Sequence, residues 1–221
     1  SKIVTEISTP QPSGFLLIGE NGYGINLYVP CNDNAVYIFN ADDFNLKKTL
    51  ITGAPATDVA ISGNGVVFVT VNNQWTNPIS SYDEKAGLVL GTLNSLCIYG
   101  GSRIRKIPKQ NTLMVISTSI SPTEMDLIFY DSKGNFLKCK GDSQHGSYPL
   151  DATVFRISPN GNYVLTANSG AAYSCEESMK YFGQISRGEL TFSDFAFNSD
   201  GSVFYGAKVI GNPSKLGNFR N

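Results

Sequence analysis

Three aspartates stand where a chain could place carboxylates for acid–base chemistry. Asp58, Asp151 and Asp194 each stand at the start of a short segment rich in β-branched and aromatic residues. Glycoside hydrolysis needs two carboxyl groups at a defined separation. Asp58 and Asp194 lie about six residues before the following turn and Asp151 about nine, so the three positions are not equivalent. Asp is also a common turn residue that accepts backbone N–H bonds, and we expect this structural role here.

The chain has a single histidine, His145. A Ser-His-Asp triad, a Cys-His pair or a metal site with several histidines would have to use it. His145 lies in the polar segment 141–150 (GDSQHGSYPL), which is typical of an exposed connection. Residues 18–24 (IGENGYG) precede no helical pattern, so they form neither a P-loop nor a dinucleotide-binding motif. We therefore expect no catalytic residue, no metal and no cofactor.

One cluster of basic residues interrupts an otherwise balanced charge distribution. Its members alternate with apolar residues and are Arg103, Arg105, Lys106 and Lys109. Alternate residues of a strand face opposite sides, so the cluster predicts a solvated strand edge, with a patch for an acidic partner as the alternative. The formal net charge of −1 offers no general electrostatic attraction to nucleic acid or to an anionic membrane.

The composition is that of a folded protein with a core. Of 221 residues, 41% are hydrophobic and 16% are charged, which excludes a disordered chain. The 22 glycines and 10 prolines exclude a coiled coil. Neither a signal peptide nor an apolar run long enough to cross a bilayer is found, so we expect no membrane insertion and an intracellular or virion-assembled location.

The four cysteines are Cys31, Cys97, Cys139 and Cys175, and no two have a CxxC spacing. Buried free cysteine behaves as a small hydrophobic residue, and disulfides are rare in reducing compartments. We therefore expect four reduced, half-buried thiols. One or two disulfides are the alternative.

Short strand-like segments recur along the whole chain. They contain four to seven residues rich in Val, Ile, Phe, Tyr and Thr, for example 35–40 (AVYIFN), 66–71 (VVFVTV) and 112–118 (TLMVIST). Helical periodicity occurs only around residues 174–182. The dipeptides Asn-Gly, Asp-Gly or Gln-Asn, at 21–22, 64–65, 110–111, 160–161 and 200–201, predict five hairpins at intervals of roughly 40 to 50 residues. This spacing is typical of the blades of a β-propeller.

Residues 34–73 (NAVYIFNADDFNLKKTLITGAPATDVAISGNGVVFVTVNN) contain the repeat at its greatest length. Parts of it return at 126–139, 151–168 and 193–207, whereas residues 72–106 fit poorly. This pattern resembles the YVTN-type propeller repeat, which is related to the WD40 repeat. The resemblance implies an all-β fold of about five four-stranded blades in a single domain, residues 1–221.

The resemblance also implies a position for each strand. Inner strands are expected near 13–19, 56–62, 102–107, 151–158 and 192–198, and each second strand follows its hairpin. The third and fourth strands are expected near 35–40 and 45–51, 78–83 and 87–92, 125–131 and 135–140, and 178–183 and 187–191. Residues 209–221 remain for the outer half of the fifth blade, and residues 2–8 would close the ring. A longer propeller, cut short in this chain, is the alternative.

Four side chains form a candidate binding rim. In the WD40-like arrangement, the loops between second and third strands share a face with the loops between blades. The resemblance therefore places Trp75, His145, Tyr148 and Tyr173 on one face. Trp and Tyr anchor protein interfaces and stack on sugars, so this rim is the first candidate for a binding surface, although local packing would also explain these residues.

The expected function is a structural or protein-interaction platform in a larger assembly, such as a phage or virion accessory protein, without enzymatic activity. A carbohydrate-binding propeller is the alternative. The resemblance also suggests lactonase-like propellers, but these rely on several histidines and seven blades, so a lactonase or glycosidase-type hydrolase is disfavoured. The expected partner is a protein or a glycan, and not a nucleic acid.

Overall fold

A computed structural model describes residues 6–13, 15–73, 77–94, 96–117, 119–185 and 191–208. The described residues form eighteen strands, all paired antiparallel, and they form no helix. Consistent with this, the described part of the chain has no helix that could span a membrane. The all-β fold class expected from the sequence is confirmed.

The strands form four four-stranded sheets, called blades 1 to 4, and one strand pair. Blade 1 contains β1 (Leu17–Asn21), β2 (Gly24–Cys31), β3 (Ala35–Asn40) and β4 (Leu46–Ile51). Blade 2 contains β5 (Ala56–Ile61), β6 (Val66–Val71), β7 (Ile79–Asp83) and β8 (Val89–Leu93). Blade 3 contains β9 (Arg103–Lys106), β10 (Thr112–Ser117), β11 (Glu124–Tyr130) and β12 (Phe136–Gly141). Blade 4 contains β13 (Phe155–Ile157), β14 (Tyr163–Thr166), β15 (Ala171–Ser174) and β16 (Tyr181–Gln184), and the pair is β17 (Phe192–Phe197) and β18 (Phe204–Lys208).

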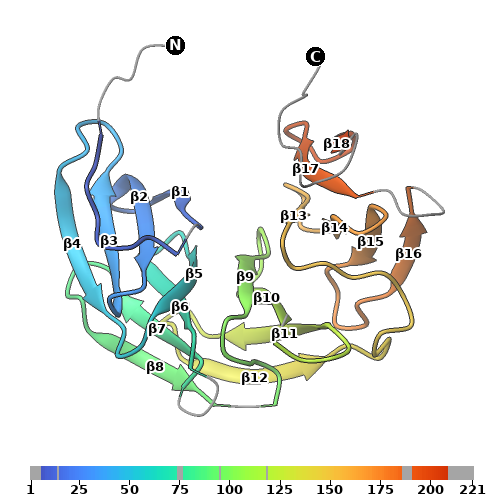
Figure 1. Cartoon of the computed structure of the whole chain (residues 1–221), viewed down its shortest axis with the longest axis horizontal. Coiled ribbons are helices and arrows are strands. Elements are labelled where there is room, and N and C mark those ends of the chain that lie inside the picture. Colours follow the sequence, from blue (N-terminus) through green and yellow to red (C-terminus); the bar gives the residue numbers. More distant parts are fainter. Residues whose placement is uncertain are drawn as a thin grey trace.

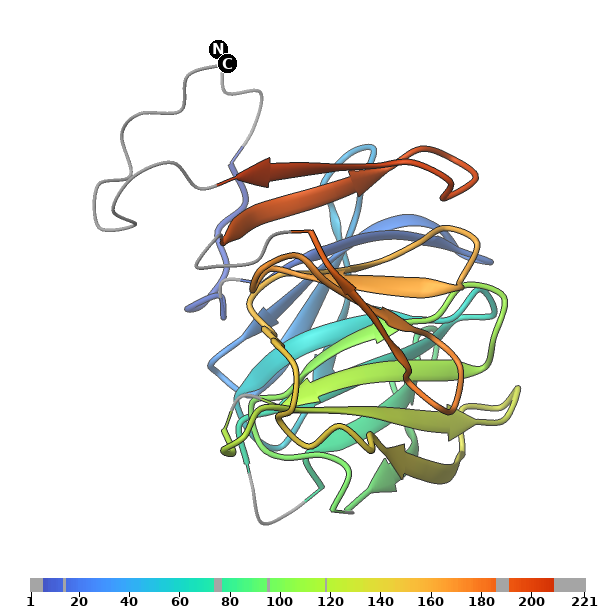
Figure 2. The ribbon, with the colours of Figure 1, turned by 90° about the vertical axis from the view of Figure 1, so that its right-hand side faces the viewer.

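The blades follow one another in an arc around a common centre (Figure 1). The first strand of each blade lies nearest the centre, and β4, β8, β12 and β16 lie at the periphery. Seen from the side, the β17–β18 pair continues the series beyond blade 4 (Figure 2). Five inner strands therefore exist and overlap the expected ranges, although β1 begins at Leu17 instead of near residue 13 and β13 includes only Phe155–Ile157.

The apolar core lies between neighbouring sheets. Separate clusters of buried side chains fill the spaces between blades 1 and 2, blades 2 and 3, and blades 3 and 4. A smaller cluster, built on Leu165, Phe192 and Phe195, joins blade 4 to β17. Every residue of β6 and of β10 is buried, which explains why these two strands are mainly apolar on both faces instead of alternating between apolar and polar residues.

The hairpins at the expected turn dipeptides are packed against one another. Gly65 has a φ of 82°, and a Cβ built on it would lie 2.3 Å from the ring of Tyr23 in the hairpin of blade 1. Gly161 has a φ of 77°, and its Cβ would lie 2.6 Å from the carbonyl oxygen of Pro108. Glycine is therefore required here both for the turn and for the contact between successive blades.

The positions expected for the third and fourth strands of blade 4 are wrong. The third strand is β15, at Ala171–Ser174, and the segment expected to contain that strand instead contains the fourth strand, β16. Ser169 and Gly170, with φ values of 57° and 62°, reverse the chain directly after β14. The sequence of β15 is AAYS, and Ala and Ser have little preference for strands, so the pattern did not reveal it. Most of 187–191 lies outside the described residues.

The expectation of four reduced thiols is also wrong. Cys97 and Cys139 form a disulfide with a Cα–Cα distance of 6.1 Å, whereas Cys31 and Cys175 are free and buried. The bond ties the connection that precedes β9 to the outer strand of the same blade. The two cysteines are 42 residues apart, so only the folding of blade 3 brings them together.

Closure of the ring stays a prediction. Of the expected closing segment, residues 6–8 are described and lie outside any strand. Residues 2–5 and 209–221 lie outside the described residues. A bridge between Pro12 and Cys31 joins the segment that precedes blade 1 to β2, and Ile7 packs against the buried Val29 and Phe39.

Candidate functional site

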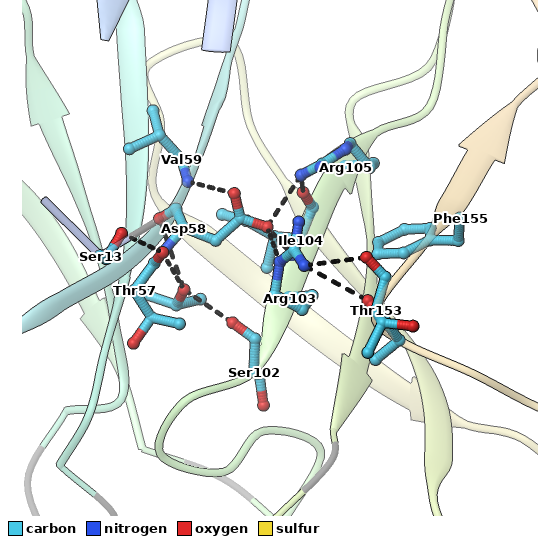
Figure 3. A network of polar contacts seen from close by, with 12 residues as sticks. Ser13, Thr57, Asp58, Val59, Ser102, Arg103, Ile104, Arg105, Thr153 and Phe155 are labelled. Atoms are coloured by element: carbon cyan, nitrogen blue, oxygen red, sulfur yellow. Dashed lines mark hydrogen bonds and ion pairs between the residues drawn. The ribbon is translucent and has the colours of Figure 1, made fainter. Parts of the chain in front are cut away.

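A buried ion-pair network connects the inner strands of blades 2 and 3 (Figure 3). The Oδ2 atom of Asp58, on β5, accepts hydrogen bonds from Arg103 Nε at 2.7 Å and from Arg105 Nη1 at 2.8 Å. The same oxygen accepts the backbone N–H of Ile104 at 3.1 Å, and Oδ1 accepts that of Val59 at 3.0 Å. Four donors thus occupy a carboxylate that is 3% exposed.

Arg103 extends this network to blade 4 and to the segment before blade 1. Its Nη1 donates to the carbonyl oxygens of Ala152 at 3.4 Å and Thr153 at 3.3 Å. The guanidinium carbon lies 3.4 Å from the centroid of the Phe15 ring, a cation–π contact. Burial lowers the pKa of Arg103, and the charge of Asp58 opposes this shift. The expected solvated strand edge is therefore wrong at Arg103, because the residue points between blades instead of into solvent.

Arg105 is the accessible member of the network. Its side chain is 23% exposed, and its guanidinium carbon lies 5.2 Å from the centroid of the Phe155 ring. Its Nη1 also donates to the carbonyl oxygen of Ile104 at 2.6 Å. Arg105 thus contacts both neighbouring blades, through Asp58 on one side and Phe155 on the other.

A second ion pair, in which the carboxylate pairs with an arginine of the preceding blade, joins blade 4 to the β17–β18 pair. Asp194 accepts from Arg156 Nε at 2.9 Å and from Arg156 Nη2 at 2.9 Å. Asp194 stands in β17 where Asp58 stands in β5, four residues before the residue that closes each hairpin, Asn198 and Ser62 respectively. The repeat therefore uses the same inner-strand carboxylate to fasten an adjacent blade twice.

The third candidate aspartate, Asp151, stabilises its own turn. Its Oδ1 accepts the backbone N–H of Thr153 at 2.7 Å and also the hydroxyl of Thr153. Asp58, Asp151 and Asp194 thus each have a separate structural role, with different hydrogen-bond partners, and do not form one carboxylate cluster. The described residues also contain no group of His, Cys, Asp and Glu that could hold a metal ion.

The structure brings two members of the expected rim together. Tyr148 is 41% exposed and stacks on Tyr181, with ring centroids 3.9 Å apart and planes at 14°. Tyr181 in turn lies 5.4 Å from Tyr173. Tyr173 belongs to β15 and not to a loop; it is 2% exposed, and its hydroxyl donates to the carbonyl oxygen of Pro149. Tyr173 therefore packs on the buried side of Tyr181 and is not available to a partner.

His145 contacts two acidic residues, one through its backbone and one through its side chain. The backbone N–H of His145 donates to Asp142, and its side-chain Nδ1 lies 2.9 Å from Glu124 Oε1. The side chain of His145 is otherwise largely exposed, as the polar segment predicted. Trp75 lies outside the described residues.

Comparisons with solved structures identify the architecture. The β-propeller domain of Cps50 (Swd1) from Myceliophteria thermophila matches with a TM-score of 0.64 at 11% identity, over 90% of this chain and 62% of that one. The fold is a β-propeller. Hydrazine synthase from Kuenenia stuttgartiensis also matches, with a TM-score of 0.62 at 15% identity, over 91% of this chain and 57% of that one.

The chain spans less than two thirds of either propeller neighbour. No protein-family model and no curated protein matches the sequence, so the resemblance to the YVTN-type repeat stays a prediction. One neighbour is named as an enzyme, and a propeller can host unrelated functions. The function of this propeller therefore depends on its own residues.

Proposed function

We propose that this β-propeller is a non-catalytic platform that binds other proteins within a larger assembly. The proposal depends on the bonding of the inner-strand carboxylates. Asp58, Asp151 and Asp194 each hold guanidinium or backbone groups of the fold. A general acid or base must instead reach the proton that it transfers. These carboxylates join or stabilise blades, which favours a rigid disc whose loops are available for binding.

The composition supports an assembly component. Only 16% of the residues are charged, and Asn, Ser and Gly are abundant, which would suit a phage or virion accessory protein. β-Propellers present variable loops on the two faces of a disc, so several partners can contact one such protein.

The solution mass of the purified chain tests this proposal. It is measured alone and after incubation with lysate from its source, and any co-eluting protein is identified. A complex of defined stoichiometry is the expected result. A monomer that retains no protein, or one that hydrolyses lactone or glycoside substrates with loss of activity in Asp58→Asn, would overturn the proposal.

Carbohydrate binding is the second candidate, and the exposed stack of Tyr148 on Tyr181 favours it. An aromatic ring held flat on another ring is a rigid surface on which a sugar can stack. Retention on a polysaccharide column that Tyr148→Ala abolishes, and that Tyr148→Phe preserves, would support this function. Equal retention of the wild type and both variants would exclude Tyr148 as its basis.

A further inference from the structure

A cavity of about 310 Å³ lies between blades 1 and 2, and neither the ion-pair network nor the rim uses it. Its lining comes from the β1–β2 hairpin, from β3 and β4, and from the β7–β8 turn, and consists of Tyr23, Ile38, Lys47, Lys48, Glu84 and Lys85. Three of these six side chains are lysines, whereas the chain as a whole is close to neutral. Among the six lining residues, positive charge therefore exceeds negative charge.

The one carboxylate among the six lining residues forms no ion pair with these lysines. Glu84 is 4% exposed and accepts hydrogen bonds from neutral donors: Asn21 Nδ2, Asn26 Nδ2 at 2.8 Å and the Tyr28 hydroxyl at 2.8 Å. Lys47 Nζ donates to Asn26 Oδ1 at 2.9 Å and not to Glu84. Glu84 thus belongs to a hydrogen-bond network between the two blades.

Two lysines remain available to a ligand. In the described part of the chain, neither Lys48 nor Lys85 forms an ion pair. Lys48 reaches from β4 across to blade 2, because its Nζ lies 3.7 Å from the position that a Cβ on Gly87 would take. Lys85 lies in the same β7–β8 turn as Gly87. The two ammonium groups therefore approach the cavity from adjacent blades.

The remaining wall is apolar and held in place. The Tyr23 ring lies against Gly65, where a Cβ would be 2.3 Å from it, and Ile38 forms part of the buried core between the blades. Close to the lysines, the neighbouring turns carry Asp42, Asp43 and Asp83. Asp42 and Asp43 are exposed, and together these carboxylates would repel an extended polyanion such as nucleic acid more strongly than a short acidic segment that contacts only the cavity.

We propose that this cavity binds a short acidic segment of a partner protein. A Glu or Asp carboxylate of that segment would lie between Lys48 and Lys85, and an adjacent apolar side chain would pack on Tyr23. A paired charge together with a buried apolar anchor is a common basis of peptide recognition. This inference deepens the proposed platform function, because it names the partner chemistry, and it rests on that function.

Fluorescence anisotropy with a labelled hexapeptide of alternating Glu and Leu tests the cavity directly. The double variant Lys48→Ala/Lys85→Ala should weaken binding at least about tenfold, or ~1.4 kcal/mol. The matched control is Lys133→Ala/Lys140→Ala, two lysines of blade 3 outside the cavity, and it should bind as the wild type does. The corresponding Gln-Leu peptide should not bind. Equal affinity of both double variants, or equal binding of both peptides, would overturn the proposal.

Two further experiments distinguish peptide binding from the binding of small anions, and the cavity proposal from the platform function. If millimolar inorganic phosphate displaces the peptide from the wild type as readily as unlabelled peptide does, the site is one for small anions and the peptide proposal is overturned. The lysate experiment is then repeated with Lys48→Ala/Lys85→Ala. A partner that the wild type retains and this variant loses supports the proposal. A partner that both retain overturns it and leaves the platform function intact, whereas the absence of any partner for the wild type contradicts the platform function itself.

Discussion

The Asp58 carboxylate and the Arg103 guanidinium, 45 residues apart in the chain, lie 2.7 Å from one another between the inner strands of blades 2 and 3. Arg105 approaches the same oxygen. This charge pair joins two sheets that also contact each other through buried apolar side chains and, farther from the centre, through the hydrogen bond from the Ser81 hydroxyl to the carbonyl oxygen of Gly134 at 2.7 Å. It therefore fixes the relative position of the blades where they converge on the centre.

Loss of the Asp58 charge should strongly lower the free energy of unfolding. Asp58→Asn leaves Arg103 buried without its counter-ion, and breaking a buried pair in this way costs about 3–5 kcal/mol of unfolding free energy. Asp194→Asn removes the equivalent carboxylate from a solvent-exposed pair and should cost less than about 1 kcal/mol. Urea denaturation of both variants measures the difference. Equal losses would contradict the structural role assigned to the buried network.

Stability should fall as the pH rises through neutrality. Asp126 is buried on β11, its Oδ2 has no hydrogen-bond partner among the described residues, and burial, with Glu124 and Asp142, raises its pKa to about 8. The folded state therefore holds a proton that the unfolded state releases near pH 4, so the unfolding free energy decreases between about pH 4 and 8. Urea denaturation at pH 5 and pH 8 measures this decrease. Asp126→Asn, which cannot ionise, should reduce it; an unchanged pH dependence in this variant would contradict the assignment.

The thiol count should reveal the disulfide. Titration of the unfolded protein without reductant should find two thiols, Cys31 and Cys175, and four after reduction. Cys97→Ser/Cys139→Ser removes a cross-link over a 42-residue separation, which should lower the unfolding free energy by roughly 3–4 kcal/mol. Four thiols before reduction would show that the bond does not form in solution.

Two glycines with similar backbone angles separate strain from packing. Gly53 and Gly65 have φ values of 73° and 82°, but a Cβ on Gly53 would meet nothing within 4 Å. Gly53→Ala should therefore cost only about 1 kcal/mol of unfolding free energy, the penalty of the left-handed backbone. Gly65→Ala should cost clearly more, because the Tyr23 ring must move, and it should also weaken the binding of the acidic peptide. Thermal or urea unfolding of the pair provides the comparison, and equal losses would show that the hairpins are not packed as described.

Local sequence determined the strands of this propeller. The turn dipeptides and the β-branched segments act over a few residues. The sequence therefore predicted directly the four hairpins with an Asn-Gly or Asp-Gly turn, each of which joins an inner strand to the second strand of its blade. The polar segment around His145 likewise predicted that its side chain is exposed. The fifth pair, in blade 3, followed from a less typical Gln-Asn turn. The third strand of blade 4 was missed because Ala171–Ser174 carries little strand preference and owes its conformation to its neighbours.

Only the tertiary structure decided which side chains meet. Arg103 and Tyr173 both read as surface residues, yet one points between two blades and the other lies beneath Tyr181. Partners for Asp58 and Cys97 lie more than forty residues away in sequence. The physical reason is that strand preference depends on a residue's immediate neighbours, whereas the twist and spacing of successive sheets determine which face of each strand is covered.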